Sequence, residues 1–186
     1  VTDFVSFVDF APTILEAAGV ASDKKALASS GRSLSDIFQS GVDGRSNPAR
    51  DHTLIGRERN DIGRPGDVGY PIRGIVKDGL AYLENAEPSR WPACNPETGY
   101  LNVDASPTKT FILEARRQAG TDPFWSLCFG KRPPVELYDL RADADCVKNL
   151  ATEPALAARR SALREEMHAR LRAQGDPRMF GQGAVF

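Results

Sequence analysis

The dipeptide Asp78-Gly79 constrains the fold of this 186-residue chain more than any other local feature. It stands between two largely apolar runs, residues 71–77 and 80–85. A two-residue turn that joins antiparallel strands needs positive φ at both positions, and Asp-Gly adopts this conformation readily. The sequence therefore predicts a β-hairpin in which Ile75 and Tyr82 lie near each other across the two strands.

Other short segments suggest the rest of a small sheet. Residues 52–56 and 135–140 have the composition of strands, and an acidic turn follows the second of them. Residues 87–134 are rich in Pro, Gly, Asn and Asp, and they predict only a short helix over 111–117.

A long helix is predicted near the C-terminus. Thr152 can cap it, Pro154 fits its first turn, and Gly175 can end it. Its apolar residues fall on one stripe, which consists of Leu156, Leu163, Met167 and Leu171. The opposite side is crowded with Arg and Glu, so we expect the helix to pack on one side only. Sheet and helix together predict an α+β fold.

A second helix is predicted over residues 9–19, with Asp9 as its cap and Gly19 as the left-handed residue that ends it. Its apolar face consists of Phe10, Ile14, Leu15 and Ala18. Residues 20–50 then have the composition of a surface connection with one helical turn at 34–38. A connection this long favours a crossing between two structural units.

Composition and charge exclude several classes of partner. The 24 Lys and Arg residues nearly balance the 25 Asp and Glu residues, which gives no reason to expect nucleic acid or an anionic membrane. No apolar run approaches the ~20 residues that span a bilayer. The chain begins with Val1 and has no signal-peptide pattern, so we expect it to be cut from a longer protein. Its three cysteines, Cys94, Cys128 and Cys146, allow at most one disulfide and lack metal-site spacing.

Three stretches in order resemble the sulfatase family. Val5–Leu15 resembles a late helix of that family, and Gly31-Arg32-Ser33-Leu34 resembles the Gly-x-Ser-Leu that follows it. Glu136–Leu140, followed by Asp143 and by Asn149-Leu150, resembles the closing strand and turn, after which a C-terminal helix also follows in the family. Together these matches run over nearly the whole chain, which therefore resembles the C-terminal portion of a sulfatase.

The middle of the chain resembles the sulfamidase-like (heparan N-sulfatase-like) branch. The segments that carry this resemblance are Gly56–Arg59, Tyr70–Arg73, Arg90–Pro92, Asn95–Tyr100 and Ser106–Lys109. In that branch a His commonly follows the Arg-Glu-Arg stretch, whereas this chain has Asn60 at that position.

The resemblance implies an alkaline-phosphatase-like (α/β) fold in which a large N-terminal domain carries the active site. Residues 1–45 would be the tail of that domain, and residues 46–186 a C-terminal subdomain with an antiparallel sheet and a helix. It also implies Ca²⁺ and a formylglycine in the full-length protein, a sulfated carbohydrate substrate, and a periplasmic or secreted location. The missing catalytic domain is then the main partner of this chain, and self-association through the apolar face left uncovered is a further expectation.

The family's catalytic groups are expected to lie outside this chain. Its modified residue sits in Cys/Ser-x-Pro-x-Arg, and the near match at Cys94 has Thr98 where Arg belongs. Its metal-binding acids come from motifs upstream of Val1. Asp139, Asp143 and Asp145 lack the Gly and the distal Glu of a calcium loop. We therefore predict no catalytic and no metal-binding residue in this chain.

The predicted substrate-binding residues are Arg57, Glu58, Arg59 and Asn60. They follow a strand and lead into a Gly-rich loop, and loops at strand ends often carry binding groups. The planar guanidinium suits a sulfate or a carboxylate. The alternative for this segment is a surface ion-pair cluster. Lys109 is a weaker candidate, and we expect Trp91, Tyr100 and Trp125 to be buried anchors rather than sugar-stacking residues.

The leading hypothesis is an enzyme fragment, the C-terminal part of a hydrolase of sulfuric esters or sulfamates that completes a sulfated-sugar pocket. By itself the chain is predicted to be inactive. Two alternatives remain: a non-catalytic carbohydrate-binding or interaction module, and a related hydrolase of phosphate or phosphonate esters.

Overall fold

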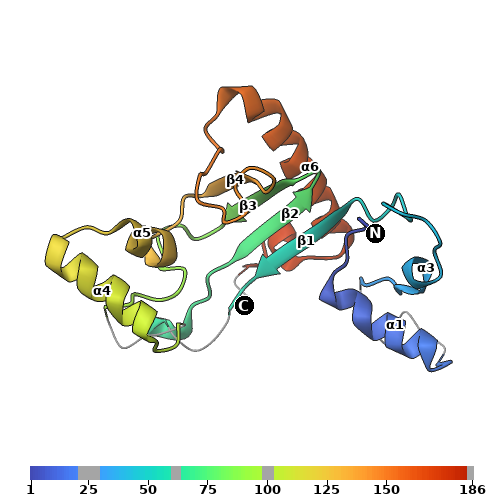
Figure 1. Ribbon diagram of the computed structural model, residues 1–186, viewed down its shortest axis with the longest axis horizontal. Helices are drawn as coiled ribbons and strands as arrows, with labels where there is room; N and C mark the ends of the chain where they lie inside the picture. Colours follow the sequence, from blue (N-terminus) through green and yellow to red (C-terminus); the bar gives the residue numbers. More distant parts are fainter. Residues whose placement is uncertain (21–29, 60–63, 98–102, 184–186) are drawn as a thin grey trace.

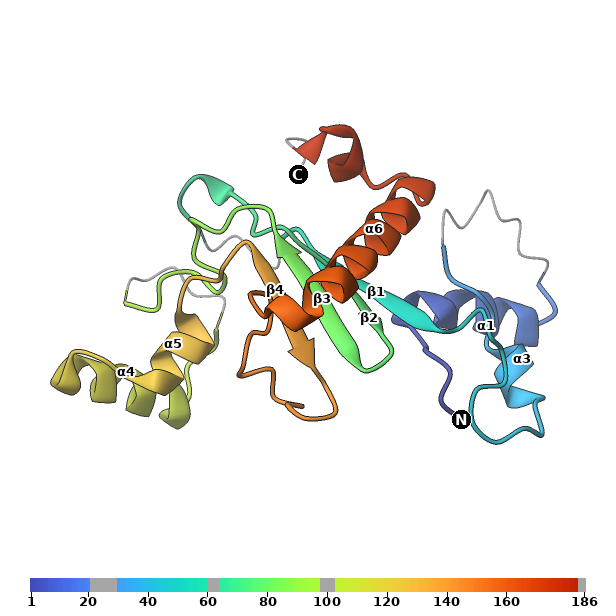
Figure 2. The same cartoon turned by 90° about the horizontal axis from the view of Figure 1, so that it is seen from above.

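The computed structural model describes residues 1–20, 30–59, 64–97 and 103–183. Its elements are η1 (Phe7–Asp9), α1 (Phe10–Ala17), α3 (Ser35–Phe38), β1 (His52–Arg57), η2 (Pro65–Asp67), β2 (Ile72–Lys77), β3 (Leu80–Asn85), α4 (Pro107–Ala119), α5 (Pro123–Phe129), β4 (Val135–Asp139), η3 (Pro154–Leu156), α6 (Ala157–Ala173) and η4 (Pro177–Phe180). The sheet lies in the middle, with α1 and α3 at one side and α4 and α5 at the other (Figures 1 and 2).

The four strands form one antiparallel sheet in the order β1-β2-β3-β4. The predicted hairpin between β2 and β3 is confirmed: Asp78 and Gly79 have φ of 53° and 80°, and Ile75 pairs with Tyr82. The strands predicted over 52–56 and 135–140 are also confirmed, as β1 and β4.

Helix α6 covers one face of the sheet. Since strand side chains alternate between the two faces, Ile75, Tyr82 and Leu137 project from neighbouring strands onto the same face. There they pack against the predicted stripe of α6, and no member of this core is more than 6% exposed. The core confirms the α+β class. The predicted Thr152 cap is wrong, because a short η3 turn with Glu153 at its N-cap precedes α6.

The N-terminal segment has little apolar core. The predicted helix is confirmed as η1 and α1, and Gly19 has φ of 69°. However, no residue of α1 is buried, and Phe7 and Ile14 are 86% and 66% exposed. Polar contacts hold this segment instead.

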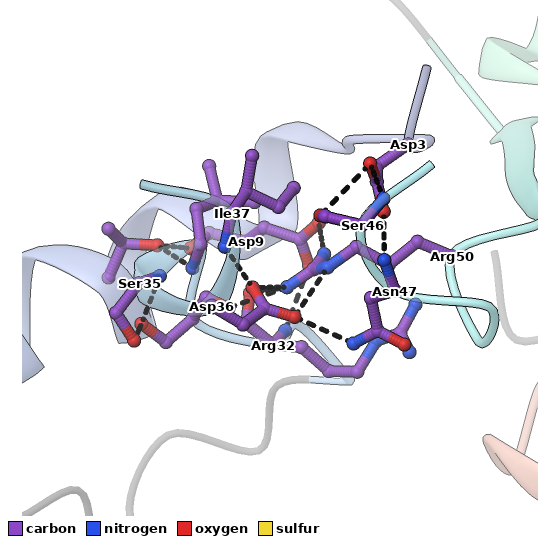
Figure 3. A network of polar contacts seen from close by, with 12 residues as sticks. Asp3, Asp9, Arg32, Ser35, Asp36, Ile37, Ser46, Asn47 and Arg50 are labelled. Atoms are coloured by element: carbon purple, nitrogen blue, oxygen red, sulfur yellow. Dashed lines mark hydrogen bonds and ion pairs between the residues drawn. The ribbon is translucent and has the colours of Figure 1, made fainter. Parts of the chain in front are cut away.

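Arg50 stands at the centre of these polar contacts (Figure 3). It is 1% exposed, and its guanidinium pairs with Asp9 at 3.2 Å and with Asp36 at 3.1 Å. The Asp9 carboxylate also accepts hydrogen bonds from the backbone N–H groups of Ser6 and Arg32. Asp9 therefore makes no side-chain cap on α1, contrary to the sequence-based expectation, because its oxygens tie together three other segments.

The segment that connects β3 to β4 contains the helices α4 and α5. α4 is longer than the helix predicted over 111–117, because the Ser106 side chain caps it by accepting from the Lys109 N–H. α5 was not expected from the sequence. Both helices pack around Trp125, which is 7% exposed and meets Trp91 edge to face at 5.9 Å. Trp125 is a buried anchor, as predicted, whereas Trp91 packs against it only partly buried and Tyr100 lies outside the described residues.

None of the helices in the described part of the chain combines the length and the apolar character needed to cross a membrane. The proposed division of the chain near residue 45 stays a prediction.

Candidate functional site

The candidate site lies where β1 ends and the chain turns back toward β2. Three predicted substrate-binding residues, Arg57, Glu58 and Arg59, lie at or just beyond the last residue of β1. The fourth, Asn60, lies outside the described residues. Pairing of β1 with β2 extends through Arg57, opposite Ile72, so the sheet fixes the backbone from which Arg57 projects.

Arg57 shares a hydrogen-bond acceptor with Arg64, the residue before η2. The Nη2 atom of Arg57 donates to the carbonyl oxygen of Pro92 at 3.0 Å, and the Nη2 atom of Arg64 donates to the same oxygen. Arg64 also donates from Nε to the carbonyl oxygen of Trp91 at 2.8 Å. Because one oxygen accepts from both side chains, the two guanidinium groups are held within a few ångströms of each other.

The ring of Tyr70 lies beside both arginines. The Cζ atoms of Arg57 and Arg64 are 6.0 Å and 5.6 Å from the ring centroid, within the range of cation–π contacts. Tyr70 is 1% exposed, and its hydroxyl has no hydrogen-bond partner among the described residues. Burial raises the pKa of Tyr70, so the hydroxyl stays a neutral donor near pH 7. Because burying an unpaired hydroxyl costs free energy, a bound acceptor here would be stabilised.

No acid within the described residues neutralises this pair of arginines. Their polar contacts there are to the Trp91 and Pro92 carbonyl oxygens, although Arg64 is only 6% exposed. Burial lowers the pKa of Arg64, and the positive charges of Arg57 and Arg90 also lower it. Two unit charges about 5 Å apart repel by roughly 1 kcal/mol in water and by about 3 kcal/mol near a protein surface. Such an arrangement favours an anion.

Glu58 belongs to a different cluster. Its carboxylate accepts from Nη2 of Arg73 at 2.6 Å and from Nη2 of Arg178 at 2.7 Å. Asp176 completes the cluster by accepting from Arg73 at 3.1 Å. Burial alone would raise the pKa of the Asp176 carboxyl, but the hydrogen bond from Arg73 lowers it. Glu58 thus links the end of β1 to the segment after α6, which is the ion-pair alternative considered for this stretch.

The remaining candidates are engaged in local contacts. Arg59 pairs with Asp67 at 2.9 Å, and its side chain is 39% exposed. Lys109 is buried in the first turn of α4, where its Nζ donates to the carbonyl oxygen of Val103 at 2.7 Å. Direct substrate contact by Arg57, Glu58, Arg59 and Asn60 therefore stays a prediction. Arg64 joins the candidate site, although the sequence pattern did not single it out.

A cavity of about 530 Å³ lies at the same end of the sheet, partly lined by Arg73, Arg164 and Arg178. Each of these arginines is paired with a carboxylate, Arg73 and Arg178 with Glu58 and Arg164 with Glu84. This cavity therefore lacks the uncompensated charge that distinguishes Arg57 and Arg64 within the described residues.

One group of side chains has the spacing of a metal site. Asp51, His52 and Glu166 offer ligand atoms within 4.8 Å of one another. However, the Nζ atom of Lys77 lies among them, 2.7 Å from Asp51 and 2.9 Å from Glu166. Ca²⁺ takes roughly six to eight oxygen ligands and would have to displace this ammonium group, so the group does not fit the implied calcium.

The residues that resemble the family's modified motif and metal acids have other environments. Cys94 is 1% exposed. Asp143 accepts hydrogen bonds from the backbone N–H groups of Val147 and Lys148, and Asp139 accepts from Arg141, as expected for a turn. That the family's modified residue and calcium ligands lie outside this chain stays a prediction.

Comparison with known proteins gives structural matches only. No family model matches the sequence, and no curated protein is similar to it. Among solved structures, the "putative sulfatase" of Bacteroides thetaiotaomicron VPI-5482 is 18% identical with a TM-score of 0.52, over 91% of this chain and 25% of that one. BT1596, a 2-O GAG sulfatase, is 18% identical with a TM-score of 0.51, over 91% and 25%.

A third structure is BT4656 in complex with its substrate D-glucosamine-2-N,6-O-disulfate. It is 17% identical with a TM-score of 0.47, over 90% of this chain and 24% of that one, and this likeness is too low to support an argument. The chain spans about a quarter of the length of the solved structures that it matches. Its sheet and helices match the C-terminal part of sulfatase structures, which confirms the fold expected from the resemblance.

Proposed function

We propose that this chain is the C-terminal part of a sulfatase and that it forms one wall of a pocket for sulfated carbohydrate. Two observations support this. The fold matches the C-terminal part of sulfatase structures, and Arg57 presents a guanidinium without an acidic partner among the described residues at the end of β1. The second observation carries the proposal, because it gives the matched fold a group that can bind an anionic sugar.

The role of this chain is binding rather than bond cleavage. Arg57 would donate hydrogen bonds to an anionic substituent of the sugar, while the sheet holds its backbone in place. In the intact protein, Ca²⁺ and a formylglycine held by residues outside this chain would supply charge stabilisation and the nucleophile. The proposed reaction is hydrolysis of a sulfuric ester or a sulfamate, with the sulfamidase-like branch as the finer assignment.

The same proposal names a partner and a location. The catalytic domain would cover residues 1–45, where Phe7, Phe10 and Ile14 are exposed. The intact protein would act in the periplasm or outside the cell, where sulfated glycans are encountered.

The test is to replace Arg57 by Ala in the intact protein and to measure kcat/KM on two substrates. A sulfated oligosaccharide should lose about 10- to 150-fold, mainly through KM, because a charge-assisted hydrogen bond remote from the reacting sulfur acts through binding. A small aryl sulfate should lose little. Arg59→Ala tests the second predicted arginine in the same assay, and Arg172→Ala, an exposed position of α6, is the control.

The outcomes separate three roles for Arg57. Equal losses on both substrates would place it at the reacting sulfate or in the fold, and no loss on either would make it an ordinary surface charge. The isolated 186-residue chain should hydrolyse neither substrate in the presence of calcium. Turnover by the isolated chain that is removed by Cys94→Ala would contradict the proposal.

A further inference from the structure

We propose that Arg57 and Arg64 act as a pair that binds one oxyanion, and that Arg64 is a specificity-determining residue of this protein. The identity of the ligand as a sugar substituent rests on the proposed function. The anion site itself rests only on the geometry of Arg57, Arg64, Tyr70 and Pro92.

Two like charges converge at this site. The Nη2 atoms of Arg57 and Arg64 both donate to the Pro92 carbonyl oxygen, which brings the two cations together at a neutral acceptor. A carbonyl dipole does not cancel two positive charges. A buried cation is tolerated when a counter-charge completes its environment, and leaving it unpaired is costly.

Several other buried or half-buried arginines have a different environment. Arg50, Arg73, Arg132 and Arg178 each form an ion pair with a carboxylate, at Asp9, Glu58, Glu136 and Glu58 respectively. Arg64 is 6% exposed, yet within the described ranges it donates hydrogen bonds only to carbonyl oxygens. The chain thus pairs several buried or half-buried arginines with carboxylates, whereas Arg64 has no carboxylate partner among the described residues. The half-buried Arg160, which donates to the carbonyl oxygen of Ala151, is a second such case.

Arg57 and Arg64 keep guanidinium N–H donors that no described residue occupies. A guanidinium has five N–H donors. Among the described residues, Arg57 uses only Nη2, and Arg64 uses Nε and Nη2. Tyr70, whose ring lies beside both side chains, adds a buried hydroxyl that has no partner among the described residues. Several convergent donors and a net positive charge are what a sulfate or a carboxylate requires.

Lys131 adds a positive charge close to the ring of Trp91. Its Nζ lies 5.2 Å from the ring centroid of Trp91, whose carbonyl oxygen binds Arg64. Glu87 lies 3.5 Å from Arg90 and offsets that residue. Burial and the nearby charge of Glu136 raise the pKa of Tyr70, but Glu136 is itself paired with Arg132. The ligand class is therefore an oxyanion: a sulfate group of the sugar or the carboxylate of a uronic sugar.

The experiment measures anion binding by the 186-residue chain, without any hydrolysis. Sodium sulfate is titrated against sodium chloride at equal ionic strength, and the side-chain Nε–H signals of arginine are followed by NMR. Sulfate should shift the signals of Arg57 and Arg64 in a saturable manner, whereas chloride should not. Arg57→Ala and Arg64→Ala should each weaken sulfate binding by about 10- to 150-fold. Arg172→Ala should leave it unchanged.

Two further variants keep the test decisive. Arg64→Lys keeps the charge but loses the planar fork, so it should retain binding weaker than that of the wild type and stronger than that of Arg64→Ala. If Arg64→Ala does not fold, Arg57→Ala and Arg64→Lys still decide the matter. Unchanged sulfate affinity in both would overturn the proposal. So would sulfate binding that appears only in Asp61→Asn, because a carboxylate of the chain would then be the natural counter-ion.

A heparin-derived oligosaccharide and its desulfated form identify the oxyanion. Binding of the sulfated form alone assigns a sulfate group, and equal binding of both assigns a carboxylate. If inorganic sulfate binds through Arg57 and Arg64 but neither oligosaccharide does, the anion site stands and the sugar pocket of the proposed function fails. If the oligosaccharides bind independently of both arginines, the pocket stands and the paired site fails.

Discussion

Lys77 shows how one charged residue joins two elements of this fold. From β2 its ammonium group reaches Asp51, before β1, at 2.7 Å and Glu166 of α6 at 2.9 Å. Hydrogen bonds with Asp51 and Glu166 raise the pKa of Lys77. Burial alone would raise the pKa values of Asp51 and Glu166, but their hydrogen bonds to Lys77 lower both. The group of Asp51, His52 and Glu166, which has the spacing of a metal site, is therefore part of an ion cluster centred on Lys77.

This cluster predicts acid-sensitive stability. Because the carboxyl pKa values are lowered from 3.8 and 4.5 in the folded state, their stabilising effect is present above those values and is lost as the pH falls below them. Lys77→Met should cost about 1–2 kcal/mol at pH 7. This difference from the wild type should shrink toward pH 3, as measured by urea unfolding.

The control for this prediction is Lys148→Met, since Lys148 is exposed and its side chain has no ion pair within the described residues. Its effect should be small at both pH values. A cost of Lys77→Met that stays constant from pH 7 to pH 3 would show that the Lys77 side chain acts through packing rather than charge.

At the scale of elements, α6 is the main source of core packing. Its residues Leu163 and Met167 are 1% and 0% exposed against the sheet. Leu163→Ala should destabilise the chain by about 2–5 kcal/mol through lost transfer energy and a cavity. Arg164→Ala should cost about 1 kcal/mol or less, because its side chain is 57% exposed and its pair with Glu84 is screened by water.

Urea unfolding of the two variants compares neighbouring positions of one helix, so helix propensity is nearly matched. Equal losses of unfolding free energy would mean that the buried stripe of α6 is wrongly assigned.

Elements with strong local signals could be predicted from the sequence. Asp78-Gly79 fixes the hairpin within two residues, and the apolar spacing of α6 identifies its buried side. By contrast, Glu153 rather than Thr152 stands at the N-cap before α6, and Asp9 is diverted from its helix by Arg50, which is distant in sequence. For Asp9 the deciding contact comes from a residue 41 positions away, which local propensity does not contain.

In the candidate site, too, some residues could be recognised from the sequence and others could not. Arg57 could be placed at a strand end because β1 has a readable pattern. Arg64 could not be recognised, because its contacts are the carbonyl oxygens of Trp91 and Pro92, in a loop without periodicity. The ion pairs of Glu58 were equally hidden, since Arg178 lies near the other end of the chain.

At the scale of the whole molecule, the two sides of the sheet differ in how they are held. α4 and α5 pack around tryptophan, whereas the N-terminal segment depends on the polar contacts of Arg50 (Figures 1 and 3). Three large apolar residues of that segment face outward: Phe7, Phe10 and Ile14 are 86%, 45% and 66% exposed. Phe7 and Phe10 meet edge to face at 5.3 Å, so they form one patch.

This patch predicts concentration-dependent self-association of the isolated chain. Phe7→Ser combined with Ile14→Ser should reduce it, as measured by sedimentation velocity over a wide concentration range, without lowering the midpoint of urea unfolding. Val147→Ser, at a residue 55% exposed in the turn region after β4, is the matched control and should change nothing. A strictly monomeric wild-type chain at every concentration would contradict the prediction.

The ion pairs around Glu58 join residues that the ribosome synthesises at widely separated times. Glu58 and Arg73 are synthesised before their partners Arg178 and Asp176, which follow them by 120 and 103 residues. Until Asp176 and Arg178 have been synthesised, the end of β1 lacks these ion pairs. The strand end that carries Arg57 would therefore reach its final structure only after they are made. A partly synthesised chain would thus expose the end of the sheet that carries Arg57 and Arg73 to other molecules.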